Sequence, residues 1–383
     1  MLESLLEIVR TASALRSPAR LAPTVPGARV MPPTFPAEEK NKPNTYLKET
    51  RIRDGEPTEA VVLDTVTSSA NRVEEALLEE IRAGRLEIAD VQIRIGDFGE
   101  ASTLELPHRI FDAYLLEGLL DGDPFPKTEL GQQLSSSTPS DATAIFLHSP
   151  TSLLFGAWDS HGDRGGLGSR FARALVIESI GFGAVEGQRA AQKTDPFIPS
   201  TGDITIYKVD GARFTFDEAR ARRKKNKPEE VKVSELGFGA VPARQHGGVT
   251  LESAEQHVLL SLGQLRRLRF PVNGNHDPAV SEAARAVLAS LGILGVELQR
   301  DRGFSLRSGC ELALVEEPMW ERVGRTLEDV QTFEVGGSSG AHELFREAVE
   351  HADSLGLRWS EPIRLEGRDE LVELVRQARE AKA

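Results

Sequence analysis

The sequence predicts an α+β fold in which helices cover a sheet. Segments with the two-residue repeat of strands and segments with the repeat of helices are mixed along all 383 residues. Hydrophobic residues make up 39% of the chain, which is enough for a globular core. Length as a prior allows about two domains or one large decorated domain.

The first half of the chain is expected to alternate helices with short strands. The expected helices occupy residues 1–20, 66–81 and 106–120, and the expected strands occupy 61–63, 88–95 and 144–147. The helix over 66–81 has the clearest signal, because its apolar side chains recur at spacings of three and four, and Asp64 is a good N-cap. Residues 21–58 are rich in proline and are expected to be irregular, and the serines of 135–137 indicate a loop.

The second half is expected to begin with a helix that leaves a glycine-rich loop at about Ser169 and runs toward Ile180. Further helices are expected at 251–268, 280–291, 340–357 and 367–382, and strands at 204–209, 294–296 and 304–315. The last two helices are amphipathic and acidic.

The charge of the chain is unevenly distributed. Lys and Arg number 46 against 59 Asp and Glu, a formal net charge of -13, which disfavours a nonspecific nucleic-acid binder. Residues 213–227 nevertheless hold seven basic and two acidic residues, whereas the chain from Glu311 onward holds nine basic and seventeen acidic residues. A local basic stripe can therefore still bind a polyanion.

Several classes of protein are disfavoured by simple absences from the sequence. Cys310 is the single cysteine, so the sequence offers no disulfide framework and no cysteine metal site. No run is judged long enough for a membrane span, and no secretory signal pattern opens the chain, so a cytoplasmic protein without a membrane partner is expected.

The glycine-rich loop after the apolar run Leu153–Phe155 is the strongest candidate for a binding site. It contains Gly165 and Gly166, and Arg164, Arg170 and Arg173 lie at its end. Bare N–H groups, the start of the expected helix and guanidinium groups together predict an anion cradle, suited to a phosphodiester chain. A tight turn with solvated arginines is the alternative interpretation, and the residues alone leave it open.

Three further sets of side chains could contact the same anion. Asn71 and Arg72 share a polar face near the start of one expected helix, and His108 and Arg109 stand at the start of another. The basic run over 219–228 lies between strand patterns and could form a protruding finger, with its charge concentrated at Arg222, Arg223, Lys224 and Lys225. An ordinary solvated face is the alternative interpretation for Asn71 and Arg72, and a solvated helix end or a mobile loop is the alternative for the basic run.

Two short motifs raise a different hypothesis, a metal-dependent phosphoesterase. Asp159-Ser160-His161 and Gly274-Asn275-His276-Asp277 match two elements of two-metal phosphoesterases, in the right order. The expected later histidine motif is missing, since His342 and His351 lie in helical patterns. Binding without a metal or another cofactor is therefore preferred, and phosphoesterase chemistry at Asp159, His161, His276 and Asp277 stays as the alternative.

Several segments together resemble one family, the backbone subunit of a type I CRISPR surveillance complex (Cascade) of subtype I-U or I-G. This family belongs to the repeat-associated RAMP proteins. The segments that carry the resemblance are RLAPTVPGARVMPPTFP, VLDTVTSSANRVEEAL, LELPHRIFDAYL, LLFGAWDSHGDRGGLGSRFARALVIESIGF, LRRLRFP and FSLRSGCELALVEE. They span about residues 20–317.

The resemblance implies a single backbone subunit over residues 1–383, with an RRM-like (ferredoxin-like) palm, large insertions and helical additions. An insertion is expected near 210–240 and an acidic helical tail over 320–383. The implied partners are CRISPR RNA, further copies in a head-to-tail filament, other Cascade subunits, and target DNA through the guide. No catalysis is implied for this subunit, whose role would be antiviral defence.

The expected RNA-binding residues combine the matching segments with the physical argument above. They are Asn71, Arg72, His108, Arg109, Arg164, Gly165, Gly166, Arg170, Arg173, Arg222, Arg223, Lys224 and Lys225.

Overall fold

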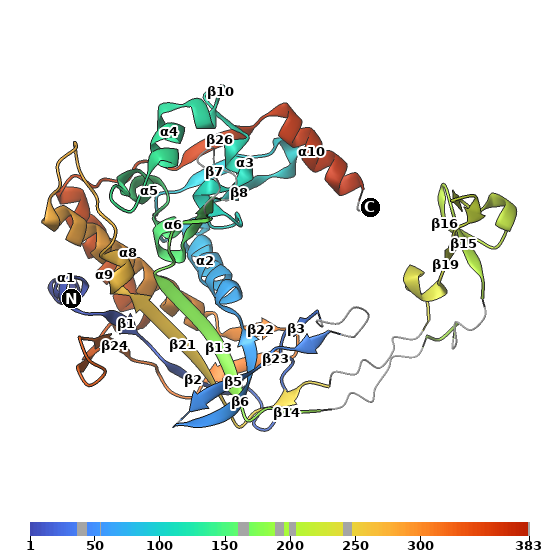
Figure 1. Cartoon of the computed structure of the whole chain (residues 1–383), viewed down its shortest axis with the longest axis horizontal. Helices are drawn as coiled ribbons and strands as arrows, with labels where there is room; N and C mark the ends of the chain where they lie inside the picture. The colour runs from blue at the N-terminus through green and yellow to red at the C-terminus, as the bar shows by residue number, and fades with distance from the viewer. Residues whose placement is uncertain are drawn as a thin grey trace.

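A large sheet forms one side of the molecule (Figure 1). The computed structural model describes residues 1–36, 44–53, 55–159, 168–187, 195–198, 204–239 and 247–381, and over these ranges the sheet has ten strands. Its centre is the antiparallel pair β13 (Leu175–Phe182) and β21 (Ser253–Ser261). The other edge of β13 pairs with β6 (Glu56–Asp64), and β5 (Lys48–Arg53) pairs with β6.

The opposite edge of β21 divides into two branches. β1 (Ala14–Arg16) and β2 (Ala19–Pro23) pair with β21 one after the other, antiparallel to it. β24 (Trp320–Val323) and β25 (Val330–Phe333) extend the sheet beyond β1. β23 (Cys310–Leu314) and β22 (Phe304–Arg307) extend it beyond β2. The sheet is therefore antiparallel throughout, with segments from both ends of the chain side by side.

Helices cover one face of this sheet. They are α1 (Leu2–Thr11), α2 (Val66–Arg82), α8 (Pro278–Asp301) and α9 (Gly337–Ser354). In β21, Val258 and Leu260 are buried against the helices, whereas Leu259 on the other face is 45% exposed. This two-residue alternation is the pattern of a strand with one buried face.

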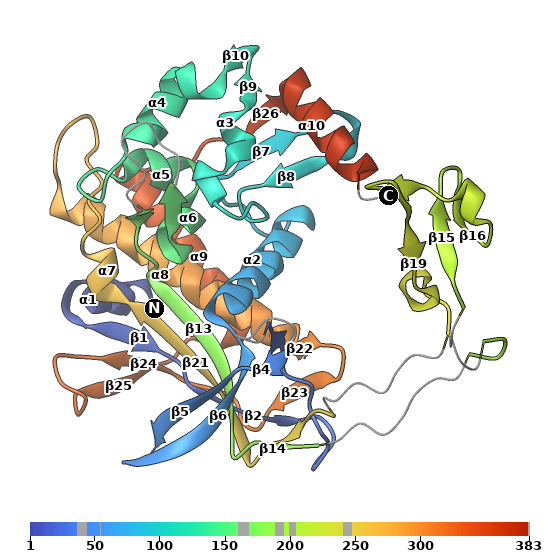
Figure 2. The same cartoon turned by 45° about the vertical axis from the view of Figure 1, so that its right-hand side comes forward.

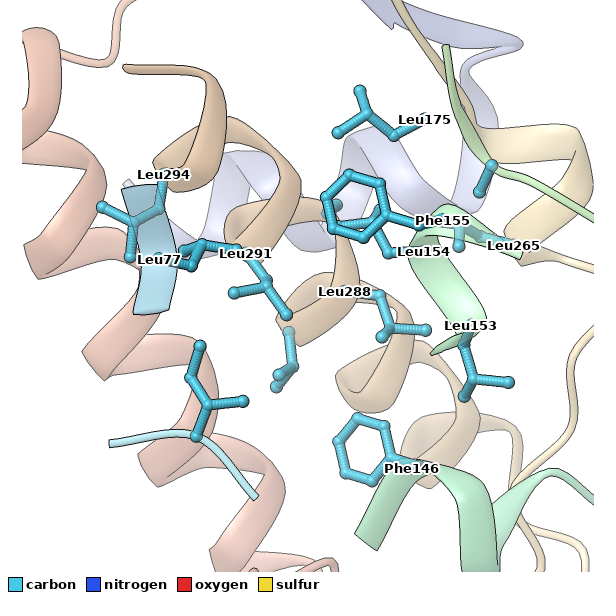
Figure 3. Packing of buried hydrophobic residues seen from close by; sticks show 14 of the residues in the cluster. Leu77, Phe146, Leu153, Leu154, Phe155, Leu175, Leu265, Leu288, Leu291 and Leu294 are labelled. Atoms are coloured by element: carbon cyan, nitrogen blue, oxygen red, sulfur yellow. The ribbon is translucent and has the colours of Figure 1, made fainter. Parts of the chain in front are cut away.

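The core is organised around α8, which is buried almost all round. Its Leu288, Leu291 and Leu294 pack toward Leu77 of α2 and toward α6 (Pro150–Phe155) (Figure 3). Gly295 lets α2 approach closely, since a Cβ there would lie 2.6 Å from Val73 Cγ1. Within the described ranges, α8 is the one helix long and apolar enough for a membrane span, contrary to expectation, and 83% of that window is buried inside the protein.

A second sheet stands beside the helices. It has the order β10-β9-β26-β7-β8, and α10 (Asp369–Glu380) packs next to it (Figure 2). Its central strand β26 (Ile363–Gly367) comes from the end of the chain and runs parallel to β7 (Val91–Arg94) and antiparallel to β9 (Gly118–Leu120). Its outer strands are β8 (Glu100–Ser102) and β10 (Asp123–Pro124), and short helices α3 (Ala113–Leu116), α4 (Glu129–Ser136) and α5 (Thr143–His148) follow along the chain.

Residues 204–239 form a small module that stands apart from the main body (Figure 2). We call this module the arm. β15 (Ile206–Val209) pairs with β16 (Ala212–Thr215) and β19 (Glu230–Val231), over a small core of Ile206, Val231 and Val233. The arm also carries a hairpin of β17 (Arg223–Lys224) and β18 (Lys227–Pro228). At its base on the main body, β14 (Val185–Glu186) pairs with β20 (Val249–Thr250).

The remaining short strands flank the main sheet and the second sheet. β3 (Thr34–Phe35) pairs with β4 (Thr45–Tyr46), and β11 (Ala157–Asp159) pairs with β12 (Gly168–Phe171).

The α+β class is confirmed, and most of the strongly periodic segments have the expected type. Helices α2, α9 and α10 and the strands β6, β7 and β15 lie where the pattern places them. The helix expected at 280–291 is α8, which is longer because its apolar residues continue around the whole surface. The expected strand at 294–296 is wrong for the same reason, since those residues are fully buried within α8.

Four other assignments are wrong where an apolar run fits either kind of element. The expected helix after Ser169 is instead strands β12 and β13, and most of the helix expected at 251–268 is strand β21 followed by the single turn α7 (Leu262–Leu265). The expected strand at 144–147 lies in α5. The helix expected at 106–120 is replaced by a 3-10 turn at Arg109–Phe111, then α3 and β9.

Smaller corrections concern the ends of elements. Helix α1 ends at Thr11, and the strands β1 and β2 occupy most of the rest of 1–20. The proline-rich segment 21–58 contains β5 and part of β6. Ser135 and Ser136 lie in α4, and Thr65 rather than Asp64 caps α2 by accepting the Ser68 N–H at 3.2 Å.

Candidate nucleic-acid interface

A cavity of about 850 Å³ collects side chains from three of the predicted segments. It lies between α2, the segment around Leu104–Arg109, the end of α6 and the pair β11–β12. Asn71, Arg109 and Arg173 all line it, although they are far apart in the sequence. The structure therefore unites one residue from each of three proposed anion contacts in a single hollow.

A buried ion pair forms the floor of this cavity. Arg109 donates from Nε to Glu74 Oε1 at 2.6 Å and from Nη2 to Oε2 at 2.8 Å. Their side chains are 12% and 3% exposed, so water does little to screen the pair. Burial raises the pKa of Glu74, while the hydrogen bonds and charge of Arg109 and the charge of Arg173 oppose that rise. The paired charges hold α2 against the segment that contains Arg109.

The remaining donors of Arg109 also have partners within the protein. Its Nη1 donates to the Gly156 carbonyl at 3.0 Å, and its guanidinium lies 5.5 Å from the centroid of the Phe155 ring. The residue has a φ of 51°, a left-handed backbone conformation that is uncommon outside glycine. Arg109 thus positions the cavity wall, and all three nitrogens of its guanidinium group already donate hydrogen bonds within the protein.

Arg173 differs, because within the described residues no carboxylate lies in ion-pair range of it. Its Nε donates to the Phe155 carbonyl at 3.1 Å. Burial and the neighbouring Arg109 lower the pKa of Arg173, and Glu74 partly opposes this. Bringing an anion to Arg173 would relieve that unfavourable environment.

The other carboxylates on the cavity wall are already matched by arginines. Glu105 pairs with Arg82 at 2.9 Å, and Arg302 lies 3.4 Å from Glu75 and 3.0 Å from Glu79. With Glu74 held by Arg109, Arg173 is the lining arginine that has no carboxylate in ion-pair range among the described residues. Arg173 is therefore the position on this wall that favours an anion.

Trp158 at the mouth of the cavity was absent from the sequence prediction. It lies on β11, is 50% exposed and lines the same cavity as Arg173. The sequence feature that could have identified Trp158 is its position directly before the glycine-rich loop, close to several arginines. An exposed aromatic side chain among basic residues is a known platform for nucleic-acid bases.

Arg170 and Arg72, by contrast, are engaged inside the protein. Arg170 pairs with Asp159 at 3.2 Å, donates to the carbonyls of Ser135 and Ser137, and lies over the Phe111 ring. Arg72 pairs with Asp64 at 3.1 Å and donates to the carbonyls of Ser305 and Leu306. These contacts tie separate segments together, and an RNA contact at either arginine stays a prediction.

The anion cradle needs a correction in its geometry. A helix start was expected after the glycine-rich loop, but β12 begins at Gly168, so no helix dipole contributes there. Arg164, Gly165 and Gly166 lie outside the described residues. The same correction applies to His108, which precedes a single 3-10 turn and is exposed; its backbone N–H donates to Asp112 Oδ2 at 3.0 Å.

The basic run of the arm, for which the sequence offered a protruding finger, contains a short hairpin. Lys225 and Asn226 make its turn with φ of 50° and 63°, as a two-residue hairpin turn requires. Arg222, Arg223, Lys224 and Lys225 are all exposed. Arg222 has a loose ion pair of 3.7 Å with Glu229, and in the described part of the chain the other three have no ion pair.

Nothing in the described geometry favours the phosphoesterase alternative. The Asp159 carboxylate is paired with Arg170, and Asp277 caps α8 by accepting the Ala279 N–H at 2.8 Å. His161 lies outside the described residues. Over the described ranges, no group of three or more His, Cys, Asp or Glu side chains is placed to hold a metal. Cys310 is fully buried, and burial raises the pKa of its thiol to about 11.

Residues 15–186 match the family model described as "CRISPR-associated protein GSU0053". The matched range contains the cavity residues Asn71, Arg109, Trp158 and Arg173, and it excludes the hairpin of the arm. No curated protein matches the chain. Residues 15–186 are thus similar to a CRISPR-associated family, and this similarity supports a role in CRISPR defence for the chain.

Proposed function

We propose that this chain is a non-catalytic subunit that binds CRISPR RNA. In this proposal several copies line up head to tail along one guide RNA in a Cascade-type complex, together with other Cascade subunits. The guide is then displayed for pairing with target DNA. The family similarity supports the CRISPR setting, and the resemblance of the matching segments supports the RAMP backbone role.

One observation carries the RNA-binding part of the proposal. Asn71, Arg109 and Arg173, chosen from separate segments of the sequence, line one open cavity, in which Arg173 has no carboxylate in ion-pair range among the described residues. A subunit that holds a guide must bind the sugar-phosphate chain without reading its bases. An amide, a free guanidinium and an exposed ring at one cavity provide such contacts.

Contacts between copies are proposed from the separation of charge. The arm holds nine Lys or Arg against six Asp or Glu, although the whole chain has a net charge of -13. Glu255, Glu316 and Glu317 outnumber the single basic residue Arg20 in the lining of a second cavity of about 470 Å³ on the main body. Arg20 lies 3.7 Å from Glu316, Arg53 pairs with Glu255 at 2.9 Å, and Met319 is 57% exposed. The basic arm of one copy and this acidic cavity of the next are complementary, and a head-to-tail contact of this kind propagates as a helix.

Two further parts of the proposal concern fold and location. An antiparallel sheet with α2 and α8 on one face is consistent with an RRM-like palm, on which the second sheet and the arm are insertions. A cytoplasmic location without a membrane partner is proposed from the sequence alone.

The proposal is tested by expressing the full chain beside a CRISPR array and identifying the nucleic acid that co-purifies. We expect RNA of guide length, bound by a chain whose mass by light scattering grows in steps of one subunit. The logarithm of the affinity for that RNA, measured by fluorescence anisotropy, should fall linearly with the logarithm of the salt concentration. A chain that stays free of RNA and monomeric under these conditions would contradict the proposal.

A further inference from the structure

Trp158 is the most exposed of the three tryptophans in the chain. Trp320 is 2% exposed and donates from Nε1 to Glu297 Oε1 at 2.8 Å, and half-buried Trp359 donates to the Phe146 carbonyl at 3.0 Å. Trp158 is 50% exposed, and no hydrogen bond joins its indole to another described residue. Since the other two tryptophans are fixed by packing and a hydrogen bond, the exposure of Trp158 needs an explanation.

The local backbone directs Trp158 to the cavity mouth. The register between β11 and β12 shifts between Ala157 and Trp158, which is the mark of a bulge. The extra residue is Arg170 on β12. Ala157 is buried and Trp158 next to it is exposed because successive side chains of a strand point to opposite faces.

Gly156 fixes the distance between this strand and Arg173. It has a φ of 84°, and a Cβ there would lie 3.0 Å from the Arg173 backbone nitrogen and 3.1 Å from the Phe171 carbonyl oxygen. Only glycine accommodates both the conformation and the close approach. The backbone therefore places an exposed indole and an arginine without a carboxylate partner on one cavity.

We infer that Trp158 stacks against an unpaired base of single-stranded RNA at this cavity, while Arg173 contacts the adjacent phosphate. This inference rests on the proposed function and adds the site at which one nucleotide is held. A volume of about 850 Å³ suits a nucleotide-sized group, and Leu104 and Leu106 give part of the wall an apolar character. Stacking accepts any base, so the contact holds RNA without reading sequence.

The cavity also contains a rigid support for this contact. Phe155 and Phe171 are each 1% exposed, so the ring available to a ligand is that of Trp158. The Glu74–Arg109 pair below them is neutral overall and leaves the Arg173 charge uncancelled. Double-stranded RNA, with its bases already stacked, has no free base face for Trp158.

The test measures RNA binding by the full chain in two ways, with a short unstructured oligoadenylate as the probe. Anisotropy of labelled RNA gives the affinity, and intrinsic tryptophan fluorescence of the protein with unlabelled RNA reports contact with an indole. We expect RNA to quench the wild-type emission. Trp158→Phe should abolish most of that quench and retain most of the affinity, whereas Trp158→Ala should bind about tenfold more weakly.

Trp359→Phe is the matched control and should keep both the quench and the affinity. Unaltered thermal unfolding of Trp158→Ala would show that its weaker binding is not a loss of folding, as its half-exposed position leads us to expect. If RNA binds but Trp158→Ala keeps the full affinity and the quench, this inference fails and the proposed function stands. If the wild-type chain shows no anisotropy change with either the oligoadenylate or guide RNA, the proposed function fails as well.

Discussion

The cavity and the arm hairpin both contain basic side chains that the sequence marked as anion contacts, but their surroundings differ. At the cavity and beside it, Arg109 and Arg170 are held by carboxylates and backbone carbonyls inside the protein. On the hairpin, Arg223, Lys224 and Lys225 are exposed and, among the described residues, have no ion pair. The difference shows that a basic residue in a promising segment is available to a ligand only if the fold leaves it without an internal acceptor.

The largest effect is expected from breaking the floor of the cavity. Arg109→Met leaves the Glu74 carboxylate buried without its ionic partner, which costs about 3–5 kcal/mol of stability. Chemical denaturation measures this loss. Arg346→Ala, which removes an exposed pair between positions 346 and 350 of α9, is the control and should change stability little.

The same variant should show a distinct dependence on pH. Burial raises the pKa of Glu74, so charging this carboxyl in the fold is unfavourable, and losing Arg109 raises the pKa further. A raised folded-state pKa stabilises the fold below the unfolded pKa, and that stability is lost as pH rises through the folded pKa. Arg109→Met should therefore be closest to wild type in stability near pH 5 and furthest from it at pH 8. A deficit independent of pH would contradict the assignment.

Substitutions in the hairpin should weaken RNA binding without a loss of stability, in contrast to Arg109→Met. Changing Arg223, Lys224 and Lys225 together to Ala should leave the thermal midpoint unchanged, because these side chains are exposed. If all three contact RNA phosphates, the plot of log affinity against log salt should become less steep, and the magnitude of its slope should decrease by about 2. The measurement is a salt titration by anisotropy, with equal concentrations of the wild-type protein and the triple variant.

Limited proteolysis gives an independent check of the hairpin. We expect trypsin to cut the wild-type chain within 222–227, and guide RNA to slow that cut. Equal cleavage rates with and without RNA would count against a role for the hairpin in binding.

Arg170 and Arg173 lie three positions apart and should differ in what their substitution changes. Arg173→Ala should reduce the salt slope by about 0.7, which corresponds to one phosphate of a single strand, with little change in stability. Arg170→Ala should lower stability, because it removes an ion pair and two carbonyl contacts, and should leave the slope unchanged. A reversed result would mean that Arg170 is released from Asp159 on binding, so that an internal ion pair does not keep an arginine from contacting RNA.

The sequence was informative where one face of an element is buried, and less so elsewhere. Helix α2 was predicted within a residue at each end because its apolar spacing is clear. Strand β21 was missed because Val258, Leu259 and Leu260 are consecutive apolar residues, which hide the alternation of a strand, and a helical pattern also fits its leucines. Residues 294–296 were read as a strand because a helix buried on all sides loses its periodicity.

Side-chain availability at the site could not have been predicted in the same way. The partners of Arg170 are the carbonyls of Ser135 and Ser137, and those of Arg72 include the carbonyl of Ser305. Backbone carbonyls carry no signal in the sequence, so only the tertiary arrangement separates a bound arginine from a free one. Trp158 was missed because it is the one exposed apolar residue of a three-residue strand, which is too short to show a periodic pattern.

The smallest effect is expected at the hairpin turn, where shape rather than charge is tested. Asn226 has a φ of 63°, which Gly adopts freely and a β-branched residue does not. Asn226→Gly should therefore keep the hairpin, while Asn226→Val should destabilise it by about 1 kcal/mol. Amide hydrogen exchange of residues 223–228 measures the difference. Because neither variant removes a cation, a loss of RNA affinity in Asn226→Val alone would show that the hairpin must present its lysines in a fixed geometry, and equal affinity would show that local charge density suffices.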